Sequence, residues 1–148
     1  MNYRAHTTIG YLLLIILIFI FLEFFSKTTV AIFTISYIFA LHMLSPDLDT
    51  RSKIYNNWGP GRVLWYPYQK TNRHRGSSHT LKGSFLRVVY FTAILTAIAI
   101  LVFKISGRAV VESLKTHNTI IIIFVVASLV ASYQHIIIDR ITAKRRKV

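Results

Sequence analysis

Histidine and aspartate are the residue types in this sequence that are best suited to chemistry. Three of the five acidic residues, Asp47, Asp49 and Asp139, occur close to a histidine in the sequence. Imidazole nitrogens and carboxylate oxygens together bind zinc, manganese and iron. The sequence contains no cysteine, which excludes disulfides, iron–sulfur clusters and thiolate zinc sites. Any bound metal must therefore be held by nitrogen and oxygen ligands.

The pair formed by His135 and Asp139 has the spacing of neighbours on one face of a helix. Side chains four residues apart lie about 5–6 Å from each other at their Cβ atoms, so both could contact one ion. Two other interpretations remain open for the pair. The two side chains could hydrogen-bond to each other, or Asp139 could pair with the adjacent Arg140.

A second pair of carboxylates, Asp47 and Asp49, follows a proline in the run Ser-Pro-Asp-Leu-Asp that starts at Ser45. In such a turn one carboxylate can bind a metal while the other bridges or orients a water molecule. Alternatively, Ser45 or Asp47 could cap a short helix at the membrane interface. His42 lies about one turn earlier, where an unpaired polar group is costly, so we expect it to have a partner, and its role stays open.

The densest motif is Arg-His-Arg-Gly-Ser-Ser-His, which begins at Arg73. His74 and His79 can converge on one ion through a turn at Gly76, and Arg73 and Arg75 supply planar donors suited to phosphate or carboxylate. The alternative is a basic loop on anionic lipid, with one of the two serines capping the next helix. A serine nucleophile is less favoured because its base would be a histidine that is needed as a ligand.

Four apolar stretches must position these residues. The sequence is 53% hydrophobic with a mean hydropathy of +0.49, which is too apolar for an ordinary soluble domain. About 20 helical residues cross a hydrocarbon core of about 30 Å. We therefore expect an all-α, polytopic membrane protein that forms a single domain over residues 1–148. The expected spans are residues 9–25, 28–44, 83–105 and 119–138.

The polar stretch at residues 45–82 contains several prolines and glycines, which predict a structured loop between the second and third spans. Its aromatic residues fit an interfacial belt or a lid over a site. These aromatic residues are Tyr55, Trp58, Trp65, Tyr66 and Tyr68. Arg87 lies about one turn inside the third span, from where its long side chain is expected to reach the interface.

The distribution of basic residues predicts the orientation of the chain. If the N terminus is cytoplasmic, 14 of the 18 lysines and arginines lie on that side, and so does the C terminus. Every candidate ligand then falls on the cytoplasmic face, including His6 near the N terminus. Only His117 falls on the other side. We attribute the net charge of +13 to orientation and anionic lipid, not to nucleic acid.

The segment from Ser45 to Tyr90 resembles a family of small, uncharacterised membrane proteins described as metal-binding. The resemblance rests on Ser-Pro-Asp-Leu-Asp, Trp-Gly followed by Leu-Trp-x-Pro-Tyr, and His-Arg-Gly-x-Ser-His, in that order. The motif order is also similar to that of membrane-bound metal-dependent hydrolases typified by the LexA-regulated inner-membrane hydrolase. The resemblance implies metal ligands at His6, Asp47, Asp49, His74, His79, His135 and Asp139.

The function expected from these patterns is a metal-dependent hydrolase at the cytoplasmic membrane face. It would hold one or two divalent ions, with zinc favoured and manganese or iron open. Whichever of Asp47 and Asp49 does not ligate would accept a proton from water, and Arg75, with Arg73 and Arg62, would neutralise an anionic phosphoester or lipid headgroup. The alternative is a non-enzymatic metal-binding membrane protein. An ion carrier ranks third, because the centres of the spans are poor in polar groups.

Overall fold

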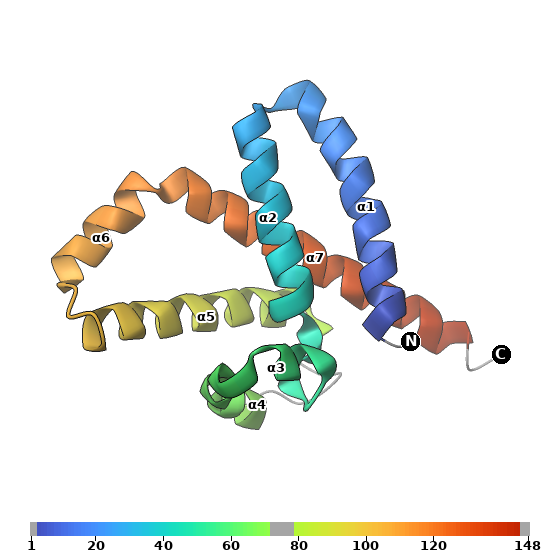
Figure 1. Cartoon of the computed structure of the whole chain (residues 1–148). Coiled ribbons are helices and arrows are strands. Elements are labelled where there is room, and N and C mark those ends of the chain that lie inside the picture. Colours follow the sequence, from blue (N-terminus) through green and yellow to red (C-terminus); the bar gives the residue numbers. More distant parts are fainter. Residues whose placement is uncertain (1–2, 72–78, 146–148) are drawn as a thin grey trace.

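The protein is all-helical in the computed structural model, which describes residues 3–71 and 79–145 (Figure 1). Four helices are long and apolar enough to cross a membrane, as the sequence predicts. They are α1 (Tyr3–Phe24), α2 (Lys27–Met43), α5 (Leu81–Leu101) and α7 (Asn118–Arg145). Within the described ranges no residue belongs to a β-strand.

The hairpin of α1 and α2 begins earlier in the chain than the hydropathy of the sequence indicates. Helix α1 starts at Tyr3, so His6 belongs to its second turn and is buried. Gly10 allows the close packing there, because a Cβ atom at this position would lie 2.9 Å from Leu41 Cδ1 and 3.2 Å from Gln134 Oε1. Helix α1 thus includes residues 3–8, which are more polar than the expected span, because its side chains pack against α2 and α7.

Helix α7 is the element on which the other long helices pack. Its inward face carries four small buried residues in a repeating pattern, Ala127, Ser128, Ala131 and Ser132. Small side chains let neighbouring helices approach closely, as they do in membrane helix bundles. The start of α1, the end of α2, the start of α5 and the later part of α7 consequently meet at one end of the molecule (Figure 1).

The part of the segment between α2 and α5 that the structure describes is folded, as predicted. Up to residue 71 it contains four short helices: η1 (Pro46–Asp49), α3 (Lys53–Asn57), η2 (Gly59–Trp65) and α4 (Tyr66–Thr71). Trp65 and Tyr68 are almost completely buried in the hydrophobic core, so the expectation of an interfacial belt or lid is wrong for both. They are buried because their rings pack on each other and on Tyr90 of α5.

Helix α6 (Gly107–Thr116) was not predicted from the sequence. It lies between α5 and α7, away from the end at which the long helices meet (Figure 1). Ser106 caps its first turn by accepting a hydrogen bond from Ala109 N at 3.2 Å. Apolar and charged residues alternate along it with helical periodicity, so its average hydropathy gives no sign of a span.

Candidate metal centre

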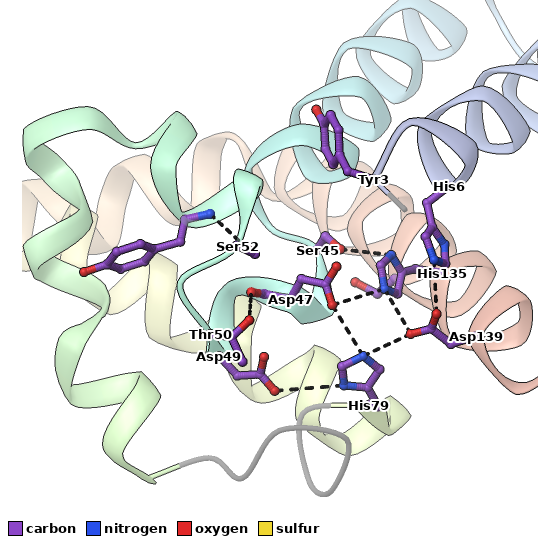
Figure 2. Close-up of polar contacts among 12 residues, drawn as sticks. Tyr3, His6, Ser45, Asp47, Asp49, Thr50, Ser52, His79, His135 and Asp139 are labelled. Atoms are coloured by element: carbon purple, nitrogen blue, oxygen red, sulfur yellow. Dashed lines mark hydrogen bonds and ion pairs between the residues drawn. The ribbon is translucent and has the colours of Figure 1, made fainter. Parts of the chain in front are cut away.

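Four side chains from three parts of the chain converge at the end where the long helices meet. They are Asp47 of η1, His79 just before α5, and His135 and Asp139 of α7, and one donor atom from each lies within 4.8 Å of the others. Figure 2 shows the two imidazole rings and two carboxylates facing one another. The structure thus brings together four of the seven predicted ligands.

Four of the distances between donor atoms are close to those found between neighbouring ligands of one metal ion. Nε2 of His79 lies 3.3 Å from Asp139 Oδ2 and 3.7 Å from Asp47 Oδ1. Nε2 of His135 lies 3.4 Å from Asp139 Oδ2 and 3.5 Å from Asp47 Oδ1. Neighbouring ligand atoms of a tetrahedral site with metal bonds of about 2.1 Å are roughly 3.4 Å apart. These four distances are compatible with one divalent cation bound between the four atoms.

His79 and His135 both direct Nε2 towards the centre, and each uses Nδ1 for a contact outside the four donors. Nδ1 of His135 lies 3.2 Å from the hydroxyl oxygen of Ser45. Nδ1 of His79 faces Asp49 Oδ2 at 4.0 Å. The buried Nε2 of His135 makes no hydrogen bond with any residue of the described ranges. Metal-binding imidazoles are commonly oriented by such outer partners, so this arrangement favours metal ligation through Nε2.

Asp49 therefore lies behind His79 and not among the four converging donors. Its side chain is completely buried, and the turn that carries it is fixed by Gln69, whose Nε2 donates to Leu48 O and Thr50 O at 3.0 Å each. The contact with His79 suits an orienting role for Asp49. Direct ligation or catalysis by Asp49 remains a prediction from the sequence.

His6 of α1 also contacts the centre, through His135 and Asp139. Its ring stacks on that of His135, with 4.1 Å between the ring centroids and 14° between the planes. Its Nε2 lies 3.1 Å from Asp139 Oδ1, whereas the other oxygen of this carboxylate faces His79 and His135. Asp139 thus links His6 to the four-residue centre.

The clustered carboxylates of the centre favour the protonated form of a neighbouring histidine. Burial by itself lowers the pKa of His79, but hydrogen bonding to Asp139 and Asp47 and the charge of Asp49 outweigh burial and raise the pKa to about 9. In the metal-free protein His79 is therefore protonated at neutral pH. A metal ion that binds here must displace this proton.

His42 has the partners that its position demands. The hydroxyl groups of Tyr3 and Tyr11 lie 2.6 and 2.7 Å from Nδ1 and Nε2 of His42, so both nitrogens are occupied. This contact ties the start of α1 to the end of α2, next to the metal centre. The role of His42 could not be read from the sequence because its partners come from another helix.

The side chain of Arg87 was expected to reach the membrane interface. This expectation is wrong, because the side chain is completely buried. His117, which follows the last residue of α6, is exposed, and its Nδ1 contacts Ser113 O at 3.0 Å. The predicted ligand His74 and the predicted substrate-binding residues Arg73 and Arg75 lie outside the described residues. Their roles remain predictions.

Comparison with known proteins agrees with the geometry. The profile of a family described as "Uncharacterized metal-binding protein (DUF2227)" matches residues 2–148. The chain belongs to this family. The family assignment and the four converging donors together identify a candidate metal site of aspartate and histidine residues. A link to membrane-bound hydrolases gains no support from these comparisons.

A curated protein of Aquifex aeolicus (strain VF5), described as uncharacterized, is 37% identical to this chain over 60 residues. The match covers 39% of this chain and 43% of that protein, so the chain spans less than half the length of this relative. No solved structure matches the chain.

Proposed function

We propose that this protein is a metal-dependent hydrolase that works at a membrane surface with one divalent cation. The observation that carries the proposal is the convergence of Asp47, His79, His135 and Asp139, whose donor atoms lie within 4.8 Å of one another. Two carboxylates and two neutral imidazoles supply a charge that one divalent cation neutralises. Zinc suits this donor set best, and manganese or iron would also accept it.

The centre is closed on its histidine side and open on its carboxylate side. The side chains of His135 and His79 are only 4% and 9% exposed, whereas those of Asp47 and Asp139 are 28% and 30% exposed. Water or a small anionic group can approach along the carboxylates. This partial opening supports a reactive site over a purely structural one.

A divalent cation held by the four donors would be five-coordinate with one bound water molecule, whose pKa the cation would lower towards neutrality. Among the three aspartates, Asp47 is best placed to accept a proton from such a water, through the carboxylate oxygen that is not turned to the two histidines. Asp49 faces Nδ1 of His79, and Oδ1 of Asp139 faces His6. The imidazoles of His79 and His135, held by their outer partners, would keep the centre rigid during the reaction.

The proposed substrate is an anionic phosphoester or a lipid headgroup. Four apolar helices end or begin near the centre, and the chain carries a net charge of +13, which favours anionic groups at its polar surfaces. The distribution of lysine and arginine supports insertion in the cell membrane with both termini in the cytoplasm. Arg75 is the proposed contact to the anion.

One observation favours the alternative of a non-enzymatic metal-binding membrane protein. His6 stacks directly on His135 and offers a further nitrogen at Asp139. If His6 also ligates, the coordination sphere is filled by protein and no position is left for water. Coordination number therefore separates the two functions.

Metal analysis of the purified protein, followed by cobalt substitution and X-ray absorption, tests both functions. We expect one divalent ion per chain with a water ligand, and hydrolysis of a phosphodiester such as bis(p-nitrophenyl) phosphate that ceases on chelation and returns on metal addition. A fully protein-ligated ion and no hydrolysis would establish the non-enzymatic alternative. Absence of stoichiometric metal would refute both.

A further inference from the structure

Helix α6 is a regular helix of ten residues, and the described part of the chain buries none of them. The side chains of Val111 and Leu114 are 49% and 43% exposed. Isolated helices shorter than about 12–15 residues are only marginally stable in water, because most helices in proteins are stabilised by packing of an apolar face. A stable α6 therefore needs a surface outside the described chain on which this face can pack.

The sequence of α6 indicates what kind of surface this is. The helical repeat places Val110, Val111 and Leu114 together on one side of the helix. Arg108 and Lys115 lie along the edge next to Val111, and both are exposed. Helices with an apolar side and basic residues lie in membrane interfaces, where the basic groups attract negatively charged headgroups. The surface that covers α6 should therefore be apolar with negative charge at its border.

The position of α6 in the chain points to the membrane as this surface. Both α5 and α7 are long and apolar enough to cross a membrane, and α6 joins them (Figure 1). Only residues 102–106 separate α5 from α6, and only His117 separates α6 from α7. Val102 and Phe103, which lead out of α5, are exposed and apolar, so the apolar surface of α5 continues towards α6. A helix this close to the ends of two spans lies at the membrane surface.

The length of α5 indicates which of the two membrane surfaces this is. Helix α5 starts shortly after His79 of the candidate metal centre and has 21 residues. A helix of this size is about 30 Å long, which equals the thickness of the hydrocarbon core. If α5 crosses the membrane, α6 and the metal centre therefore lie at opposite surfaces.

We propose that α6 is an interfacial helix that binds the lipid surface on the side of the membrane opposite the metal centre. Val110, Val111 and Leu114 enter the boundary between headgroups and acyl chains, and Arg108 and Lys115 contact lipid phosphate groups. The opposite side of the helix faces water. In this position α6 holds the end of α5 and the start of α7 at a fixed depth. The inference rests on the proposed membrane insertion but not on metal binding or hydrolysis.

Spin labels on single cysteines test the position of α6, and the sequence contains no other cysteine that would react. The full-length variants Val111→Cys, Leu114→Cys and Glu112→Cys are labelled in vesicles of phosphatidylcholine and phosphatidylglycerol. Electron paramagnetic resonance then measures their accessibility to oxygen, which concentrates in lipid, and to a water-soluble nickel complex. We expect the ratio of oxygen to nickel accessibility to be severalfold higher for the labels at 111 and 114 than for the label at 112. Leu95→Cys, at an exposed position of α5, serves as the reference for the membrane interior.

The outcomes separate this inference from the proposed membrane insertion. Equal and high nickel accessibility at all three positions of α6 would place the helix in water and overturn the inference. Immobile labels at 111 and 114 that neither reagent reaches would indicate a protein partner and would also overturn it. In both cases a label at Leu95 that only oxygen reaches would leave the insertion of α5 intact. A label at Leu95 that nickel reaches freely would overturn the insertion, and the inference with it.

A second measurement tests the basic edge of α6. In vesicles without phosphatidylglycerol, the label at Val111 should become more accessible to nickel, because the attraction to negative headgroups is lost. Joint replacement Arg108→Gln and Lys115→Gln should remove most of this response. The matched pair Lys53→Gln and Lys82→Gln neutralises two exposed lysines outside α6 and should leave the response unchanged. The same response in both pairs would overturn the contact of Arg108 and Lys115 with lipid phosphate.

Discussion

Two regions of this molecule contain the same residue types in different settings. At the candidate metal centre, His135 and Asp139 are four residues apart, with side chains 4% and 30% exposed, and they contact residues from distant segments. At α6, Glu112 pairs with Lys115 at 3.6 Å, but both side chains are about two-thirds exposed, and the imidazole of His117 contacts Ser113 O one turn earlier in the chain. The comparison shows that convergence and burial, not residue type, distinguish a candidate site from a solvated surface.

The physical reason is the different cost of charge in the two environments. An exposed ion pair such as that of α6 contributes little, because water and salt screen it. Buried carboxylates must be compensated, and at the candidate centre the imidazoles of His6, His79 and His135 lie beside them, to which a bound cation would add.

The largest expected difference between the two regions is in metal binding. Asp139→Asn removes a charged donor shared by three histidines and should reduce zinc affinity by more than about a hundredfold. Glu112→Gln is the matched carboxylate-to-amide change in α6 and should leave affinity unchanged. Chelator competition measures both, with helical circular dichroism to establish folding. Equal zinc affinity in the two variants would remove the distinction between the regions.

The second prediction concerns pH. His79 has its pKa raised to about 9 in the metal-free protein, so below this pH a proton competes with the metal. Zinc affinity should therefore rise with pH between 6.5 and 8.5, by up to about tenfold per pH unit. The metal-free fold should show the opposite trend, since stabilisation by protonated His79 is complete below about 6.5 and is lost as pH rises through 9. Melting temperatures with and without zinc measure both trends.

A smaller effect is expected from the outer partner of His135. Ser45→Ala removes the hydroxyl group at Nδ1 and should weaken zinc binding by about tenfold. Ser106→Ala removes the capping hydroxyl of α6 and should cost about 1 kcal/mol of stability with no change in zinc affinity. Isothermal titration and thermal denaturation distinguish the two. A zinc affinity that falls equally in both would indicate an indirect effect of stability.

The smallest effect on metal binding is expected for His42→Phe. This change keeps a ring but removes the contacts with Tyr3 and Tyr11, and it should cost about 1–2 kcal/mol of stability. Zinc stoichiometry should stay at one per chain, because both nitrogens of His42 face tyrosines. Denaturation and metal analysis check this. Loss of the zinc without loss of stability would place His42 among the ligands.

Much of the architecture follows from local features of the sequence. The four long helices are visible as apolar stretches, and the pair of His135 and Asp139 is visible as helical spacing. The convergence with Asp47 and His79 was expected because a single orientation places the ends of three spans on one side. Hydropathy and spacing suffice for these features because both act within a few turns of helix.

The remaining features depend on contacts between distant segments. Burial of Arg87 requires hydroxyl groups from α4 and α7 as well as from its own helix. The position of Asp49 behind His79 depends on the geometry of a short 3-10 turn that no periodicity reveals. Helix α6 was missed because its mixed polarity lowers its average hydropathy, although a helical alternation of apolar and charged residues was present to find it.

The order of the donors along the chain has a consequence for biosynthesis. Asp47, His79, His135 and Asp139 are separated by long stretches, and the last two lie in the final helix. A ribosome must therefore synthesise α7 as far as Asp139 before all four donors exist. Before that point Asp47 lacks the imidazole of His135, and Arg87 lacks the hydroxyl group of Ser132. Binding of metal would then follow the packing of α7 against the earlier helices.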